Sequence, residues 1–411
     1  MTTIDQGRTT DREQHDLAAG GPALRRLVAD PAGFAADVWG RRPLLTRAGD
    51  LPSGEELLTE AAVDELVSTR GLRTPFLRVA KDGTTQPDRS FTSGGGVGAG
   101  IADQLDDTRL ARLFAEGSTL VLQALHRTWP PLVTFTQQLA VDLGHPVQVN
   151  AYVTPPQSRG FDDHYDVHDV FVLQVGGTKR WRLHDPVHPA PLRDQPWTDR
   201  RDAVGAEAAR EPVLEATLEP GDVLYLPRGT LHAATALGDV STHLTFGVHV
   251  WHRQHLAQDL ATAAVRRLAD DLDVRTSLPL GVDVADPDAI RAHAELVRER
   301  LVAAVRDVPV EQLAATLAGR SASTSRAEPV GPLAQLRLGR GLDGSTPLRL
   351  RGALAARLDG DRLRTRVGDV DVAQVGPVAL ARLLDGAVVR ADDLGLGPAR
   401  ALVAAGVVVP A

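Results

Sequence analysis

The strongest constraint on the fold is a series of short apolar segments between Thr119 and Gln254. These segments are rich in β-branched or aromatic residues and read STLVLQA, VQVNAYV, VFVLQV, KRWRLH, VLYLP and THLTFGVHV. Turn signals such as Gly176-Gly177 and Pro220-Gly221 separate them, and one helix is expected at about 132–143. Many short strands joined by turns favour a β-sandwich or barrel, and a cupin-type jelly roll fits best.

Three potential metal ligands lie in this strand-rich region. His164 and Asp166 are separated by one residue in GFDDHYDVHDVFVLQ, so alternation along a strand would place both on one face. His232 follows an apolar strand and a Pro-Arg-Gly turn in EPGDVLYLPRGTLHAA. Two imidazoles and one carboxylate can hold one face of an octahedral metal ion and leave the other open, as in the facial triad of non-haem Fe(II) oxygenases. The pattern therefore predicts a catalytic metal site and not a closed structural one.

Other polar residues compete for places in this site. His168 would share a strand face with the first pair, and Asp169 follows it directly, so either could line the site. His184 and His188 lie in a proline-rich turn and are expected to be exposed to solvent. His243 lies on a late strand, where it could face the barrel interior or be an ordinary half-buried strand residue.

The chain has only two lysines, Lys81 and Lys179, and the second lies within the metal-motif region. A lysine that points into a barrel is costly to bury without an anionic partner. If Lys179 faces inward, a bound carboxylate is its natural partner. Strand alternation alone leaves open whether the side chain points inward or toward solvent.

Composition excludes several other classes of protein. The chain contains no cysteine, which rules out disulfides, thiolate zinc sites and a cysteine nucleophile. No apolar run approaches the roughly 18 residues that span a membrane, and the polar N-terminus lacks an apolar signal core, so a cytoplasmic protein is expected. The net charge of −8 argues against broad binding to nucleic acid.

The sequence predicts an α+β protein built from several parts. A disordered tail at 1–22 precedes a cupin catalytic domain with N-terminal helices at 23–255. Amphipathic helices follow at 256–320, then a linker at 321–332. Short strands alternate with helices at 333–411, as in a small winged-helix domain.

Two stretches of the chain carry a family resemblance. QVNAYVTPPQSRGFDDHYDVHDVFVLQVGGTKRWRLHDP and LEPGDVLYLPRGTLHAA closely resemble the ribosomal oxygenases, JmjC-type cupin proteins that use Fe(II), 2-oxoglutarate and O₂. The similarity is strongest at 118–252, and the later helices and C-terminal part match the family's modules in order and size. The resemblance implies that His164, Asp166 and His232 are the iron ligands and that the helical module forms a homodimer.

The resemblance also implies a co-substrate pocket. Lys179 matches the basic residue that pairs with the distal carboxylate of 2-oxoglutarate. Asn150 and Tyr152 match positions that line the pocket, and His243 matches a histidine near it. Several relatives have serine where this chain has Gly247, so one hydrogen bond to the co-substrate is expected to be absent or supplied by water.

The activity implied is hydroxylation of an arginine or histidine side chain of a ribosomal protein. A cupin hydroxylase of a free amino acid or small natural product would use the same triad and lysine, although it would not need the extra modules. A third reading is a non-enzymatic regulator that contacts nucleic acid through the winged-helix-like end. Aspartates offset most arginines after residue 319, which argues against nucleic acid but leaves it open.

Overall fold

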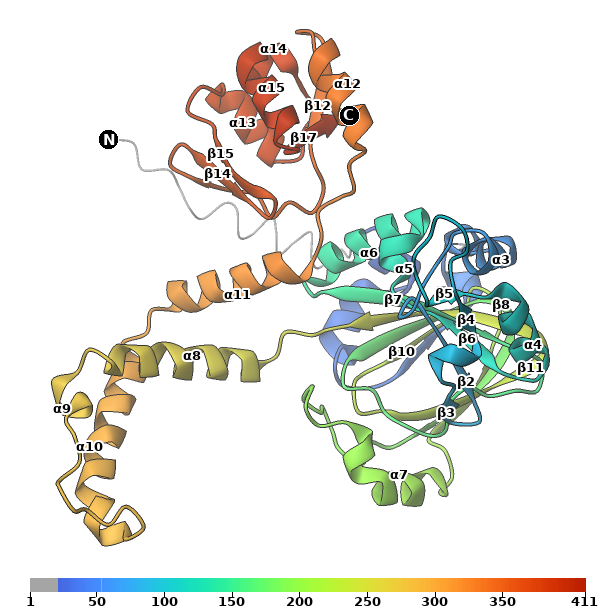
Figure 1. Ribbon diagram of the computed structural model, residues 1–411, viewed down its shortest axis with the longest axis horizontal. Helices are drawn as coiled ribbons and strands as arrows, with labels where there is room; N and C mark the ends of the chain where they lie inside the picture. The colour runs from blue at the N-terminus through green and yellow to red at the C-terminus, as the bar shows by residue number, and fades with distance from the viewer. Residues whose placement is uncertain (1–20, 53) are drawn as a thin grey trace. The chain divides into compact units, whose positions relative to one another are not determined.

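The computed structural model describes residues 21–52 and 54–411 of the chain. They divide into two compact units, and the division in the chain falls between Val250 and Trp251 (Figure 1). The predicted tail at 1–22 lies almost entirely outside the described residues. None of the helices in the described ranges is long and apolar enough to cross a membrane.

The first unit is built around an antiparallel sheet, which has nine strands within the described residues. Its order is β1-β10-β8-β11-β7-β6-β2-β3, with β9 paired to β8. The strands are β1 (Leu44–Thr46), β2 (Leu77–Lys81), β3 (Thr84–Thr85), β6 (Thr119–Leu122), β7 (Val147–Thr154), β8 (Asp169–His184), β9 (Leu214–Leu218), β10 (Val223–Leu226) and β11 (Leu231–Val248). A separate pair joins β4 (Thr92–Ser93) to β5 (Gln104–Leu105).

The long strands β8 and β11 pair with each other along most of their length. One half of this pair is flanked by β10 and β7, and the other half of β8 is flanked by β9. An isolated bridge between His164 and His232 ties the loop before β8 to the start of β11. The strands therefore bring two segments that are distant in sequence to one end of the sheet.

The predicted turn at Gly176-Gly177 does not end a strand, because β8 continues through it. The pairing with β11 leaves Val175 as an extra residue, which is a β-bulge. Gly177 has a φ of 57°, and an added Cβ would lie 2.0 Å from the main-chain oxygen of Val240. The bulge therefore requires glycine at this position.

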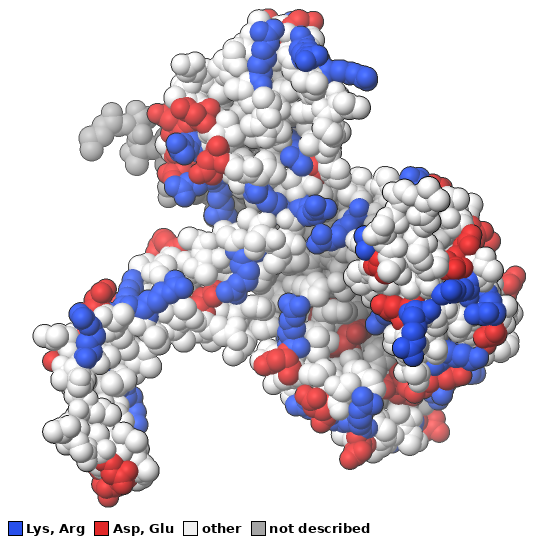
Figure 2. Space-filling model, in the orientation of Figure 1, with Lys and Arg blue, Asp and Glu red and all other residues white. Residues whose placement is uncertain are grey.

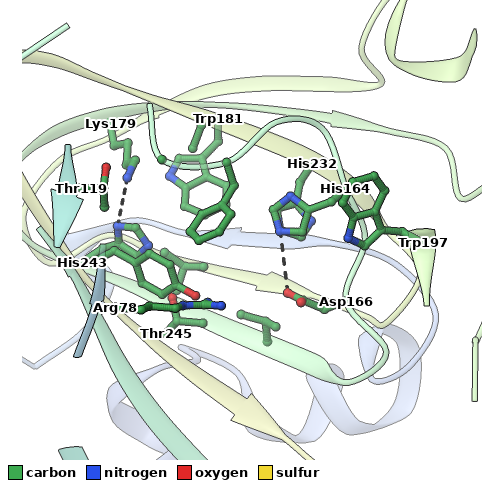
Figure 3. Close-up of a pocket in the computed structure, with 16 residues that line it drawn as sticks. Arg78, Thr119, His164, Asp166, Lys179, Trp181, Trp197, His232, His243 and Thr245 are labelled. Carbon is green, nitrogen blue, oxygen red and sulfur yellow. Dashed lines mark hydrogen bonds and ion pairs between the residues drawn. The ribbon is translucent and has the colours of Figure 1, made fainter. Parts of the chain in front are cut away.

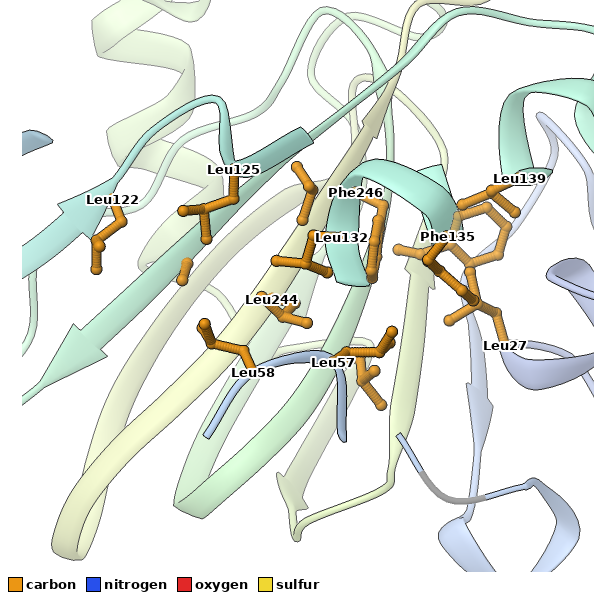
Figure 4. Packing of buried hydrophobic residues seen from close by; sticks show 14 of the residues in the cluster. Leu27, Leu57, Leu58, Leu122, Leu125, Leu132, Phe135, Leu139, Leu244 and Phe246 are labelled. Carbon is orange, nitrogen blue, oxygen red and sulfur yellow. The ribbon is translucent and has the colours of Figure 1, made fainter. Parts of the chain in front are cut away.

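One face of the sheet packs on helices to form the main hydrophobic core. Phe135 from α6 (Pro130–Leu143) meets Leu244 and Phe246 of β11 (Figure 4), and the two phenylalanine rings lie 5.2 Å apart between centroids. Successive strand residues point to opposite faces. Burial of Leu244 and Phe246 against α6 therefore directs His243 and Thr245 to the opposite side.

The remaining helices of the first unit are short. Among the expected N-terminal helices, α3 is a regular helix, whereas the described part of the segment from Leu24 to Leu57 holds only brief helical turns and β1. The helices are η1 (Leu24–Arg26), α2 (Pro31–Gly33), η2 (Phe34–Val38), η3 (Ala48–Asp50), η4 (Glu55–Leu57), α3 (Glu60–Ser68), η5 (Asp88–Ser90), α4 (Asp107–Ala115), α5 (Leu125–Thr128), η6 (Trp197–Arg200) and α7 (Arg201–Ala208).

The second unit begins with four helices, and residues of the first, third and fourth share a small apolar cluster around Ala264 and Val308. They are α8 (Arg253–Leu268), α9 (Leu272–Arg275), α10 (Pro287–Arg306) and α11 (Val310–Thr324). The predicted linker at 321–332 is shorter than expected, because α11 continues to Thr324 and α12 (Pro332–Gly341) begins at Pro332.

The C-terminal part has its own buried core, which includes Leu348, Leu363 and Leu383. It contains two small sheets, ordered β16-β12-β17 and β13-β14-β15. Its elements are β12 (Pro347–Leu350), β13 (Arg357–Asp359), β14 (Arg362–Thr365), β15 (Gly368–Asp371), α13 (Pro377–Leu384), β16 (Val389–Arg390), α14 (Ala391–Leu394), α15 (Leu396–Ala404) and β17 (Val408–Pro410). Figure 2 shows basic and acidic side chains interspersed on the visible face of this part.

Candidate metal and carboxylate site

A cavity of about 240 Å³ lies on the face of the sheet opposite α6. Its walls come from β2, β6, β7, β8 and β11, from the loop at 160–166 and from η6. Figure 3 shows two groups of polar side chains in it. His164, Asp166 and His232 lie at one end, and Lys179 and His243 lie at the other.

The three predicted metal ligands converge on one point. Each offers one ligand atom, and these atoms all lie within 4.8 Å of one another. The Nε2 atom of His232 is 3.9 Å from Oδ2 of Asp166, and the two imidazole centroids are 4.5 Å apart. This donor set, with its two nitrogens and one carboxylate oxygen, suits a divalent transition metal.

Main-chain carbonyls orient both imidazoles. Nδ1 of His164 lies 2.7 Å from the main-chain oxygen of Asp162, and Nδ1 of His232 lies 3.0 Å from that of Thr230. Because a carbonyl oxygen can only accept a hydrogen bond, each Nδ1 must carry the proton. The lone pair is then on Nε2, which is the arrangement that a metal-ligating histidine needs.

The protonation states also suit a metal. Burial, reinforced by the charge of His164, lowers the pKa of His232 to about 4. Burial alone would raise the pKa of Asp166, but the neighbouring histidines and Arg78 outweigh it and lower that pKa overall. Near pH 7, His232 is therefore neutral and Asp166 is ionised, so neither must lose a proton to bind a metal.

The local backbone differs from the expected one. His164 and Asp166 do not lie on a regular strand, since β8 begins only at Asp169, and His232 lies within β11. Backbone hydrogen bonds join His164 and His232 in both directions, at 3.1 and 2.8 Å. A third, from Gly229 to the main-chain oxygen of Asp166, measures 3.0 Å. These bonds between the two segments, and not alternation along one strand, bring the three ligands together.

Lys179 points into the cavity. Its side chain is buried, with 4% of the residue exposed, and its Nζ donates to Oγ1 of Thr154 at 3.1 Å and lies 3.5 Å from Nδ1 of His243. Burial lowers the pKa of Lys179 to about 7. Within the described ranges, no carboxylate comes within ion-pair distance of this ammonium group. Its surroundings therefore fit a carboxylate ligand.

The bulge at Val175 determines this orientation. Before the bulge, the β8 residues that line the cavity are Val170 and Val172; after it they are Lys179 and Trp181. The inward positions thus change from even to odd numbers. Without the extra residue, strict alternation would turn Lys179 away from the cavity.

Of the other residues expected in the co-substrate pocket, the structure places some at the cavity and others away from it. Tyr152 lines the cavity, and its ring stacks on that of His243 at 4.9 Å between centroids. Asn150 is not among the lining residues, because its side-chain oxygen accepts a hydrogen bond from the backbone N–H of Ala124 at 3.0 Å. Asn150 therefore supports the loop that leads into α5.

Gly247 also lies away from the cavity. A Cβ added there would lie 3.2 Å from both Gln148 and His168. A serine would thus face those side chains, whereas Thr245, two residues earlier, lines the cavity with its own hydroxyl. The expected loss of a hydrogen bond at Gly247 is therefore not a feature of this cavity.

The competing candidates lie outside the ligand set. His168 packs against His249, with ring centroids 5.3 Å apart. Asp169 is buried and accepts hydrogen bonds from the Tyr225 hydroxyl and from the backbone N–H of residue 228. The expectation that His184 is exposed is wrong, since only 1% of it is accessible. His188 is partly buried, and its Nε2 lies 3.0 Å from a side-chain oxygen.

Sequence reasoning missed Arg78, on β2. Its guanidinium group lies 5.0 Å from the ring centroid of Phe161 and close to the Tyr152 hydroxyl, and it lines the cavity. The segment LRVAK carries no motif, and it is distant in sequence from the metal ligands. Only the pairing of β2 with β6 and of β6 with β7 brings Arg78 to the site.

A β-sheet core that holds two histidines and a carboxylate around one point defines a cupin-type metalloprotein. Residues 131–256 match the family model of the JmjC domain. The chain is 30% identical over 287 residues to ribosomal oxygenase 1 of Gallus gallus, covering 68% of this chain and 46% of that protein. It is 29% identical over 225 residues to the Aedes aegypti bifunctional lysine-specific demethylase and histidyl-hydroxylase NO66, covering 53% and 32% of the two chains.

The chain contains a JmjC domain, and it is similar to the ribosomal oxygenases and the NO66 proteins. It spans less than half the length of the two curated relatives described above. The Escherichia coli ribosomal oxygenase YcfD has a similar fold, with a TM-score of 0.54 and 18% identity, over 94% of this chain and 99% of YcfD. A YcfD complex with cobalt and 2-oxoglutarate matches with a TM-score of 0.53, at 18% identity over 93% and 99% of the two chains. The expected α+β class with a JmjC/cupin sheet core is confirmed.

Proposed function

We propose that this protein is an Fe(II)- and 2-oxoglutarate-dependent oxygenase that hydroxylates an arginine or histidine side chain of a ribosomal protein. The observation that carries the proposal is the pairing of two features in one cavity. A convergent His-Asp-His set lies at one end, and a buried ammonium group without a carboxylate partner among the described residues lies at the other. A metal chelated by a dicarboxylate would satisfy both.

Each residue has a defined task in this proposal. His164, Asp166 and His232 would hold the iron, and Lys179 would bind the distal carboxylate of 2-oxoglutarate through a charge-assisted hydrogen bond. When bound, Fe(II) with 2-oxoglutarate and O₂ supplies the oxidation that inserts one oxygen atom into a C–H bond, with succinate and CO₂ as co-products. The YcfD complex with cobalt and 2-oxoglutarate supports the same ligand pair here.

The substrate assignment is supported by the relatives, whose names are ribosomal oxygenase and histidyl-hydroxylase. We further propose that α8–α11 form a homodimer, that the C-terminal part is a winged-helix-like domain, and that the protein acts in the cytoplasm, where ribosomal proteins are made. Sedimentation velocity of the full chain tests the dimer, because a monomer mass at micromolar concentration would contradict it.

The intact masses of ribosomal proteins test the activity. Cells without the gene should lose one oxygen atom from one ribosomal protein, and the wild-type gene should restore it. A gene encoding His164→Ala should not restore it, whereas His188→Ala, a change outside the cavity, should. Identical masses in all four strains would reject the ribosomal substrate.

A further inference from the structure

The cavity contains an excess positive charge that the proposed reaction does not use. Among the described residues that line it are two cations, Arg78 and Lys179, and a single carboxylate, Asp166. On the proposed function, on which this inference rests, Asp166 binds the metal and Lys179 binds 2-oxoglutarate. The charges of a divalent ion, Asp166, the dicarboxylate and Lys179 then cancel. The positive charge of Arg78 is then the one that no group in this arrangement balances.

Arg78 has the surroundings of a group that meets substrate. Its Nε is buried and has no hydrogen-bond partner, and its guanidinium group lies against the Phe161 ring. Figure 3 shows its side chain reaching into the cavity toward the end that holds Asp166. No carboxylate of the described chain lies within ion-pair distance of Arg78, and its side chain lines the cavity that a substrate side chain would enter.

Asp162 and Asp163, which precede the metal ligand His164 in sequence, do not line the cavity with Arg78. Asp163 lies 3.9 Å from Arg182, and Asp162 lies 3.1 Å from Arg159. Neither aspartate is among the residues that line the cavity. A guanidinium or ammonium group entering the cavity would therefore meet Arg78 without an anion to receive it, and burying an unpaired charge is costly.

We propose that the cavity selects a substrate side chain without positive charge, an imidazole or a carboxamide. Arg78 determines this specificity by repelling arginine and lysine and by donating a hydrogen bond to a neutral acceptor. The proposed function allows arginine or histidine as the substrate side chain, and selection against positive charge favours histidine. The discrimination comes from a repulsive element against the wrong substrate as well as from an attractive one for the right substrate.

Equilibrium binding tests the proposal without turnover. The full chain is loaded with Zn(II) and 2-oxoglutarate, and N-acetyl-glutamine amide or N-acetyl-arginine amide is titrated to 100 mM, on the order of the weak affinity expected for such small ligands. Trp181 and Trp197 line the cavity, so their fluorescence reports occupancy. The wild type should bind the carboxamide about tenfold or more tightly than the guanidinium compound, the scale of like-charge repulsion at a partly buried site.

Variants at Arg78 distinguish an effect of its charge on substrate preference from an effect of misfolding. Arg78→Gln should abolish the preference, and Arg78→Glu should reverse it. Arg112→Gln, which removes an exposed arginine of α4, should behave as the wild type. Equal binding of the two amides by the wild type, including no binding of either, would overturn the proposal even if the charge-reversed variant failed to fold.

A second measurement distinguishes this inference from the proposed function. Tandem mass spectrometry of the oxidised ribosomal protein should locate the added oxygen on a histidine or another uncharged residue. An oxidised arginine would overturn the role of Arg78 and leave the oxygenase assignment intact. Failure of the loaded protein to bind 2-oxoglutarate, measured in the same samples, would count against the proposed function instead.

Discussion

Replacement of Lys179 by methionine should stabilise the ligand-free protein. The pKa of this lysine falls from 10.5 to about 7 on burial. At about 1.4 kcal/mol per pKa unit, this corresponds to a penalty of at most about 5 kcal/mol at pH 7. Relaxation around buried charges reduces such penalties, and replacing them by apolar groups commonly gains about 1–4 kcal/mol. We expect Lys179→Met to raise the free energy of unfolding by about 2–4 kcal/mol at pH 7.

The pH dependence of stability tests the sign of this effect. Between pH 7 and 10.5, the unfolded chain carries a proton on this lysine that the folded chain lacks. The free energy of unfolding of the wild type should therefore rise with pH across this window. In Lys179→Met that contribution is absent, so the advantage of the variant should shrink as the pH approaches 10. Urea denaturation at several pH values measures both effects.

The same substitution should weaken co-substrate binding. Loss of one partner of a buried charge pair costs about 2–5 kcal/mol, which raises a dissociation constant by roughly 30-fold to several thousandfold. Calorimetric titration of 2-oxoglutarate into the Zn(II)-loaded protein measures this loss. The matched control is Lys81→Met, because Lys81 is the chain's other lysine and its Nζ donates to an exposed main-chain oxygen at 2.6 Å. A destabilised Lys179→Met protein with wild-type affinity for 2-oxoglutarate would refute the reasoning.

Three further predictions concern the metal, the bulge and the response to acid. Asp166→Ala should lower the affinity for a divalent metal about 100-fold or more, as seen by calorimetry, and retained affinity would disprove the assigned ligand set. Gly177→Ala should unfold at clearly lower temperature than Gly238→Ala, since both have positive φ but only Gly177 has an atom within 4 Å of the new Cβ. Equal melting temperatures would contradict the required bulge. Burial lowers the pKa of His145 to about 4, so stability should fall as the pH drops from 6.5 toward 4, and His145→Gln should lessen that fall in thermal melts.

Patterns over a few neighbouring residues predicted the structure correctly where local residue types determine it. The apolar segments from Thr119 onward do form the central strands, and the spacing around His164, Asp166 and His232 identified three side chains that converge in the structure. Alternation failed where the chain departs from regular strand geometry. It suggested a common strand for His164 and Asp166, and it could not orient Lys179, because one extra residue exchanges the two faces of every later position.

The sequence by itself determined the chemistry that the protein can offer: imidazole and carboxylate donors without thiolates, strand-forming segments, and one lysine near the metal motif. Only the tertiary structure decided which groups meet. The His164–His232 bridge closes the ligand set, the bulge directs Lys179 inward, and the pairing of β2 through β6 and β7 delivers Arg78 to the same cavity. These contacts join residues far apart along the chain, so no local pattern encodes them.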